Sequence, residues 1–148
     1  MSKELIVLTA DGSCSGNPGP GGWAAHIAFY GGTEIKLSGQ EPYETTNNRM
    51  EMLAVIKGLE EIEAFAPDVQ VRVESDSAYL IRSMANGWKR SKNLDMWERL
   101  DNLNKSLEID WTYIPRNSTD AHVECDTMAK QATQRARGFA RGRKGSDR

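Results

Sequence analysis

Four acidic residues lie where separate predicted elements begin or end. Asp11 and Asp76 each follow a short β-type run, whereas Glu51 and Asp126 each lie in the first turn of a predicted helix. Ligand sets made only of carboxylate oxygens select Mg²⁺ or Mn²⁺, and two such ions about 3.5–4 Å apart can promote hydrolysis of a phosphodiester. If the four carboxylates meet at one edge of a sheet, the chemistry is that of a phosphodiester hydrolase.

The sequence does not contain the residue patterns that other common chemistries require. His26 and His122 do not adjoin a motif serine, and no glycine-rich loop ends in Lys-Ser or Lys-Thr. Cys14 and Cys125 are too few for a disulfide scaffold and lack the spacing of a structural zinc site. No apolar run approaches the ~18 residues of a membrane helix. We therefore expect a cytoplasmic protein with no membrane partner.

The apolar pattern predicts the elements that must position the carboxylates. Strands are expected over residues 5–9, 23–30, 33–38, 69–73 and 109–114. Helical spacing covers residues 50–65, 77–85 and 94–107 and a last helix that includes residues 125–132. The glycine- and proline-rich residues 11–22 predict a long turn, and Asn47 or Asn48 is the expected N-cap of the first helix. This order predicts an α/β fold, a mixed sheet with helices on its faces.

Charge is unevenly distributed along the chain. The net charge is −2, but residues 135–148 carry +5, so residues 1–134 carry −7. We divide the chain into a domain of residues 1–137 and a basic, flexible C-terminal tail of residues 138–148. The basic end indicates an anionic partner, most simply a nucleic acid, while a merely solvated tail is the alternative.

Four segments carry a family resemblance: residues 9–23 (TADGSCSGNPGPGGW), 45–52 (TTNNRMEM), 74–79 (ESDSAY) and 124–129 (ECDTMA). Over residues 4–134 the chain resembles type I ribonuclease H. The resemblance implies a five-stranded mixed sheet with helices on both faces. It also implies an endonuclease that hydrolyses the RNA strand of RNA–DNA hybrids with two Mg²⁺ ions, for which Mn²⁺ can substitute, and leaves 5′-phosphate and 3′-hydroxyl ends.

The resemblance also implies roles for individual residues. The metal-binding carboxylates of the family fall on Asp11, Glu51, Asp76 and Asp126. Substrate contacts fall on Asn17, Thr46, Asn47 and Asn48 and on backbone groups near Cys14 and Gly16. An Asn side chain offers both a donor and an acceptor to the 2′-hydroxyl that distinguishes RNA from DNA. Turn geometry at Asn17 and helix capping at Asn47 and Asn48 are alternative roles that can coexist with substrate binding.

The chain departs from the family in two places. The family's loop histidine lies about ten residues before the last Asp, where this chain has Arg116. Either Arg116 contacts a phosphate, or the loop folds so that His122 reaches the metals and transfers protons; a surface or capping role for His122 is a third interpretation. The chain is also a short form without the family's basic protrusion, and we expect the C-terminal tail to compensate for that loss.

Three other functions compete with a monomeric hybrid endonuclease. Double-stranded RNA is a second candidate substrate for the same chemistry. A binding module that has lost catalysis is disfavoured, because a pure binder gains nothing from clustered negative charge. A subdomain of a larger polymerase is the remaining alternative.

Overall fold

Five strands form one mixed sheet in the order β3-β2-β1-β4-β5. The strands are β1 (Leu5–Cys14), β2 (Gly19–Phe29), β3 (Glu34–Thr45), β4 (Gln70–Ser75) and β5 (Glu108–Tyr113). β1, β2 and β3 pair antiparallel, and β4 lies parallel to both β1 and β5. This computed structural model describes residues 4–66 and 68–146, and it confirms the predicted order of elements.

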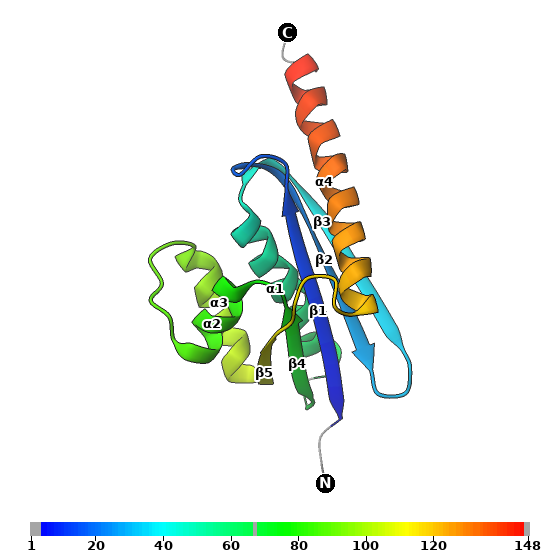
Figure 1. Ribbon diagram of the computed structural model, residues 1–148, viewed down its shortest axis with the longest axis vertical. Helices are drawn as coiled ribbons and strands as arrows, with labels where there is room; N and C mark the ends of the chain where they lie inside the picture. Colours follow the sequence, from blue (N-terminus) through cyan, green and yellow to red (C-terminus); the bar gives the residue numbers. More distant parts are fainter. Residues whose placement is uncertain (1–3, 67, 147–148) are drawn as a thin grey trace.

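Helices cover both faces of the sheet. They are α1 (Asn47–Phe65), α2 (Ala78–Asn86), α3 (Leu94–Ser106) and α4 (Asp120–Ser146). α4 packs across β1, β2 and β3 on one face, while α1 covers the other face with α2 and α3 beside it (Figure 1). In the part of the chain that the structure describes, no helix is both long and apolar enough to cross a membrane.

The main core lies between the sheet and α1. Ile6 and Leu8 of β1 and Val71 of β4 are fully buried there against Val55 and Leu59 of α1. A buried Leu or Ile side chain contributes roughly 1.5–3 kcal/mol relative to an exposed one, so this layer holds α1 against the strands. A second, smaller cluster of Ala24, Cys125 and Ala129 lies under α4. The small side chains in that cluster bring α4 close to β2.

Two glycines in the expected long turn instead belong to strands. β1 does not end near Thr9 but pairs with β2 as far as Cys14, so only residues 15–18 separate the two strands. A Cβ on Gly12 would lie 2.4 Å from the backbone nitrogen of Glu51, and one on Gly22 would lie 2.6 Å from the carbonyl oxygen of Ala129. Glycine is needed at both positions because a helix backbone approaches the strand too closely for any side chain.

Both helices that carry carboxylates begin earlier than the sequence pattern predicts. α1 begins at Asn47, and its N-cap is Thr46 rather than Asn47 or Asn48, because the Thr46 hydroxyl accepts the N–H of Arg49 at 3.2 Å. α1 ends at Phe65, and Pro67, the expected helix stop, lies outside the described residues. α4 begins at Asp120. The prediction that Glu51 and Asp126 lie in first turns is therefore wrong, and both lie in the second turn.

α4 also ends later than expected. We expected a flexible tail from Gly138 onward, but α4 continues through Gly138 to Ser146 and projects beyond the end of the sheet (Figure 1). No atom of a neighbouring described element lies within 4 Å of a Cβ built on Gly138, so the helix faces open space there. Residues 147 and 148 of the expected tail lie outside the described residues.

Candidate active site

The topology brings the four carboxylates to one edge of the sheet. Asp11 lies on β1, two residues beyond Thr9, which is the last β1 residue paired with β4. Asp76 directly follows the end of β4, so both residues lie where the parallel pair ends. Glu51 comes from α1 on one face, and Asp126 comes from α4 on the other. One pocket of about 270 Å³ is lined by Asp11, Gly12, Ser13, Asn47, Glu51, Asp76, Arg116, Asp126 and Lys130.

Asp11 sits in the middle of an extended strand and not at its end, as the sequence pattern predicted. The β1 backbone touches α1 at Gly12, so the side chains of Asp11 and Glu51 meet. The N–H of Gly12 donates to Oδ1 of Asp11 at 3.0 Å. This bond orients one oxygen of the carboxylate within the pocket.

Asp11 and Glu51 form a buried acidic pair with no Arg or Lys salt bridge among the described residues. Burial raises the pKa of Asp11 to about 6, with a hydrogen bond to Glu51 opposing the shift and the charge of Asp76 adding to it. Burial also raises the pKa of Glu51 well above its ordinary value, and repulsion by Asp11 adds to this. Within the described part of the chain, Oε2 of Glu51 is buried without a hydrogen-bond partner. The donor set is made of oxygen atoms and is short of positive charge, which fits a divalent cation.

Asp126 lies in a different electrostatic environment from this pair. Arg116 lies 3.2 Å from its Oδ1, and Lys130, one helical turn along α4, lies 2.9 Å from its Oδ2. Burial opposes ionisation, but the hydrogen bond and charge of Lys130 and the charge of Arg116 lower the pKa of Asp126. Our sequence prediction omitted Lys130, although its spacing of four residues from Asp126 on a helix is a detectable signal.

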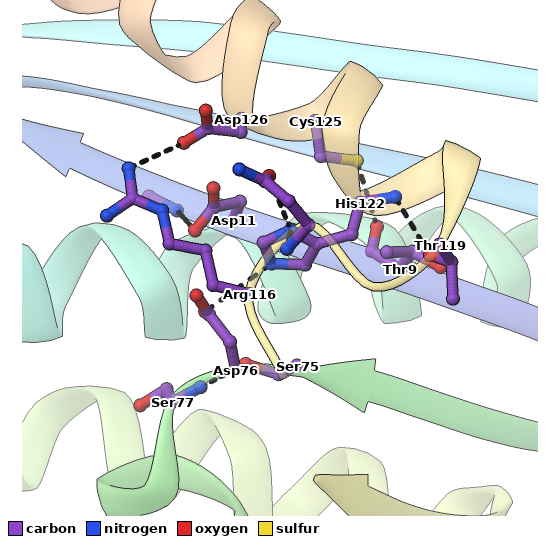
Figure 2. A network of polar contacts seen from close by, with 12 residues as sticks. Thr9, Asp11, Ser75, Asp76, Ser77, Arg116, Thr119, His122, Cys125 and Asp126 are labelled. Carbon is purple, nitrogen blue, oxygen red and sulfur yellow. Dashed lines mark hydrogen bonds and ion pairs between the residues drawn. The ribbon is translucent and has the colours of Figure 1, made fainter. Parts of the chain in front are cut away.

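His122 lies beside Asp76 and is fully buried, so a surface role is wrong. Its Nε2 lies 3.5 Å from Oδ1 of Asp76, and one potential ligand atom from each of Asp11, Asp76 and His122 lies within 4.8 Å of the others. The nearby Asp76 carboxylate raises the pKa of His122. Figure 2 shows the carboxylates of Asp11, Asp76 and Asp126 and the guanidinium of Arg116 around one space, with His122 at one side of it.

The residues expected to bind RNA gather where the β1–β2 turn meets the start of α1. Oδ1 of Asn17 accepts the backbone N–H of Asn47 at 3.0 Å, which joins the two segments. The thiol of Cys14 donates to the carbonyl oxygen of Gly16 at 2.8 Å within the turn. Asn47 lines the pocket, whereas Asn48 is exposed outside it.

A sheet of this topology, with acidic residues from both faces at one edge, defines a member of the ribonuclease H class. The profile of the RNase H family matches residues 3–134, and the chain belongs to this family. It is 41% identical to the ribonuclease H of Maricaulis maris over 91% of this chain and 97% of that protein. It is 43% identical to the ribonuclease H of Rhodospirillum rubrum over 93% of this chain and 88% of that protein.

Solved structures agree with this assignment. LC11-RNase H1 in complex with an RNA/DNA hybrid superposes with a TM-score of 0.78 at 26% identity, over 88% of this chain and 98% of that one. An N-terminal RNase H domain from Mycobacterium tuberculosis has a TM-score of 0.83 at 24% identity, over 93% and 99% of the two chains, and shares the fold. The chain is thus a nuclease of the ribonuclease H class, which cleaves the RNA strand of RNA–DNA hybrids.

Proposed function

We propose that Asp11, Glu51, Asp76 and Asp126 hold two divalent cations and that the chain cleaves the RNA strand of RNA–DNA hybrids at these ions. The convergence of the four carboxylates in one pocket is the observation that carries this proposal. The raised pKa values of Asp11 and Glu51 support it, because adjacent buried carboxylates need a cation to remain ionised together at neutral pH.

Mg²⁺ is the proposed ion, with Mn²⁺ as a substitute, because the four proposed ligands offer only carboxylate oxygens. When bound, the ions supply the positive charge that hydrolysis needs at the attacked phosphate, and the products carry 5′-phosphate and 3′-hydroxyl ends. Asp11 and Glu51 hold the ions from β1 and α1. Asp76 and Asp126 hold them from the end of β4 and from α4.

Substrate contacts are proposed at the rim of the pocket. The side-chain oxygen of Asn17 already accepts from Asn47, so its amide N–H groups are left to donate to a 2′-hydroxyl oxygen. The side chains of Asn47 and Asn48 and backbone groups near Gly16 and Cys14 complete the RNA contacts. The Thr46 hydroxyl accepts from Arg49, which leaves its O–H to donate to a phosphate of the DNA strand.

The test of this function is cleavage of labelled RNA–DNA hybrid, double-stranded RNA and single-stranded RNA with Mg²⁺, Mn²⁺ or EDTA. We expect cleavage of the hybrid with either ion, no cleavage in EDTA, and 5′-phosphate ends on the products. Cleavage of double-stranded RNA at a comparable rate would extend the substrate range. Cleavage in EDTA, or equal cleavage of single-stranded RNA, would contradict the proposal.

Arg116 is proposed to bind a substrate phosphate without being a metal ligand. Its side chain is 61% exposed, and its guanidinium reaches the pocket beside Asp126. We expect Arg116→Ala to raise KM for the hybrid about fivefold, the value for an exposed charge-assisted contact of about 1 kcal/mol. Steady-state kinetics on the hybrid measure the effect. Arg116→Lys keeps the charge but not the bidentate geometry, so its KM is expected to lie between those of the parent chain and Arg116→Ala. Unchanged kinetics in Arg116→Ala would refute the role.

The basic C-terminal segment is proposed to contact nucleic acid phosphates. The triple variant Arg141→Gln, Arg143→Gln and Lys144→Gln removes three positive charges. It leaves the buried Ala136 of α4 unchanged. We expect KM for the hybrid to rise and the slope of log affinity against log salt concentration to decrease by about 2–3, close to one for each phosphate contact. Fluorescence anisotropy across a salt series measures the slope. Lys105→Gln on α3 is the control, and an equal slope in both variants would show that the segment is only solvated.

The location and the oligomeric state are proposed from the sequence. Cys14 and Cys125 are both free thiols, which agrees with a reducing compartment such as the cytoplasm. A monomeric state remains a prediction, and sedimentation of the purified chain tests it.

A further inference from the structure

His122 is a buried polar residue for which the proposed reaction has no assigned use. It occupies the third position of α4, where its backbone N–H donates to the hydroxyl of Thr119 at 3.1 Å. Its imidazole has no exposed surface, and Nε2 has no hydrogen-bond partner among the residues that the structure describes. Such an atom, fully buried and directed at the carboxylate of Asp76, requires an explanation.

The protonation of the ring follows from its other nitrogen. Nδ1 accepts the backbone N–H of Asn117 at 3.0 Å, and Oδ1 of Asn117 lies farther away, at 3.4 Å. An imidazole that accepts at Nδ1 is neutral and carries its proton on Nε2. Nε2 is then a donor, so it cannot ligate a cation while the bond to Asn117 is made.

We propose that His122 is a positioning residue that donates from Nε2 to Oδ1 of Asp76 and thereby orients this carboxylate toward a bound cation. Nε2 lies 3.5 Å from Oδ1 of Asp76, and a donor on one carboxylate oxygen leaves the other oxygen for the metal. Outer-sphere donors of this kind orient ligands and strengthen metal binding 10–100-fold.

The same ring links the site to the loop before α4. Asn117 has the left-handed φ of 57°, and its N–H is bound by the imidazole, so His122 also fixes the turn that follows Arg116. One buried side chain thus connects the residue after β4 to the loop that carries Arg116. This arrangement separates two functions of the ring: the donor at Nε2 serves Asp76, and the acceptor at Nδ1 serves the loop.

Two substitutions separate these functions. In His122→Gln, the amide group stands near the position of Nε2 and can still donate to Asp76. In His122→Asn, the shorter amide stands near the position of Nδ1 and can accept from Asn117 but does not reach Asp76. Thr119→Val is the structural control, because it removes the N-cap bond of α4 and destabilises the same turn without altering the contact to Asp76.

The measurement is Mn²⁺ binding to the full chain by calorimetry without nucleic acid, together with the Mg²⁺ concentration that gives half-maximal cleavage. We expect His122→Asn to weaken Mn²⁺ binding and raise that Mg²⁺ concentration at least tenfold, with KM for the hybrid unchanged. His122→Gln and Thr119→Val should both stay within about threefold of the parent chain. Thermal denaturation confirms that each variant is folded.

The outcomes distinguish this inference from the proposed function on which it rests. Failure of the parent chain to bind Mn²⁺ would overturn the proposed metal site itself. Binding by the parent with equal affinity in His122→Asn would overturn only the positioning role. Equal loss in His122→Asn and His122→Gln would overturn it in favour of direct ligation by the ring, and equal loss in Thr119→Val would reduce His122 to a structural residue.

Discussion

Asp11→Asn is expected to abolish cleavage of the RNA–DNA hybrid while leaving the chain folded and able to bind the hybrid. Asp11 is the most central of the proposed ligands, because it contacts Glu51 and lies within a few ångströms of Asp76 and His122. An amide at this position keeps the shape but removes the negative charge that would hold both ions. Loss of metal-derived stabilisation of several kcal/mol corresponds to a decrease in kcat of more than about 10³-fold.

The matched control for this variant is Asp110→Asn. Asp110 lies on β5, where its exposed carboxylate faces Arg72 at 3.8 Å, away from the residues that line the pocket. We expect its cleavage rate to equal that of the parent chain within about twofold, since exposed ion pairs contribute little. Single-turnover cleavage and gel-shift binding in EDTA measure the two properties separately. Activity of Asp11→Asn within tenfold of the parent would contradict the proposed role of Asp11.

The metal-free chain is expected to lose stability as the pH rises from about 4 to above 6, opposite to the usual trend in this range. The pKa of Asp11 rises from 3.8 to about 6 on folding, so the folded state binds the proton more tightly than the unfolded state. This contribution is fully present below pH 3.8 and is lost as the pH passes through about 6. A rise in pKa from 3.8 to about 6 corresponds to about 3 kcal/mol in the free energy of unfolding. Glu51, whose pKa is also raised, acts with the same sign.

Urea denaturation at pH 4.5 and pH 7.5, with EDTA or with Mg²⁺, measures this effect. In EDTA we expect the free energy of unfolding to be lower at pH 7.5, and Mg²⁺ should restore it by binding only the folded state. Asp11→Asn should reduce both the pH dependence and the response to Mg²⁺, whereas Asp110→Asn should retain both. Stability that increases over this range in EDTA would show that the acidic pair is not destabilising.

The two sides of the pocket differ in charge, and both predictions follow from this difference. Asp11 and Glu51 lie on the β1–α1 side with no Arg or Lys partner among the described residues, whereas Asp126 on α4 is paired with Arg116 and Lys130. Ion binding should therefore relieve repulsion mainly at Asp11 and Glu51. At Asp126 an incoming metal ion must compete with the positively charged side chains of Arg116 and Lys130. Substitutions on the first side should consequently have the larger effect on both cleavage and stability.

The sequence by itself determined the order of elements and the identity of the four carboxylates. Apolar periodicity distinguishes helix from strand because the two repeat at 3.6 and 2.0 residues, and the stripe that includes Val55 and Leu59 indeed faces the core. The motifs around Asp11, Glu51, Asp76 and Asp126 are contiguous in the chain, so they can be identified without knowledge of packing. The family assignment rests on these local signals and is confirmed.

Only the tertiary structure decided how these residues are used. Gly12 and Gly22 suggest a turn by their type, but they are strand residues because α1 and α4 approach the sheet there. The burial of His122 against Asp76 likewise depends on a contact between segments distant in sequence. Local pattern cannot report them, because burial and electrostatic environment are set by neighbours that the chain acquires only on folding.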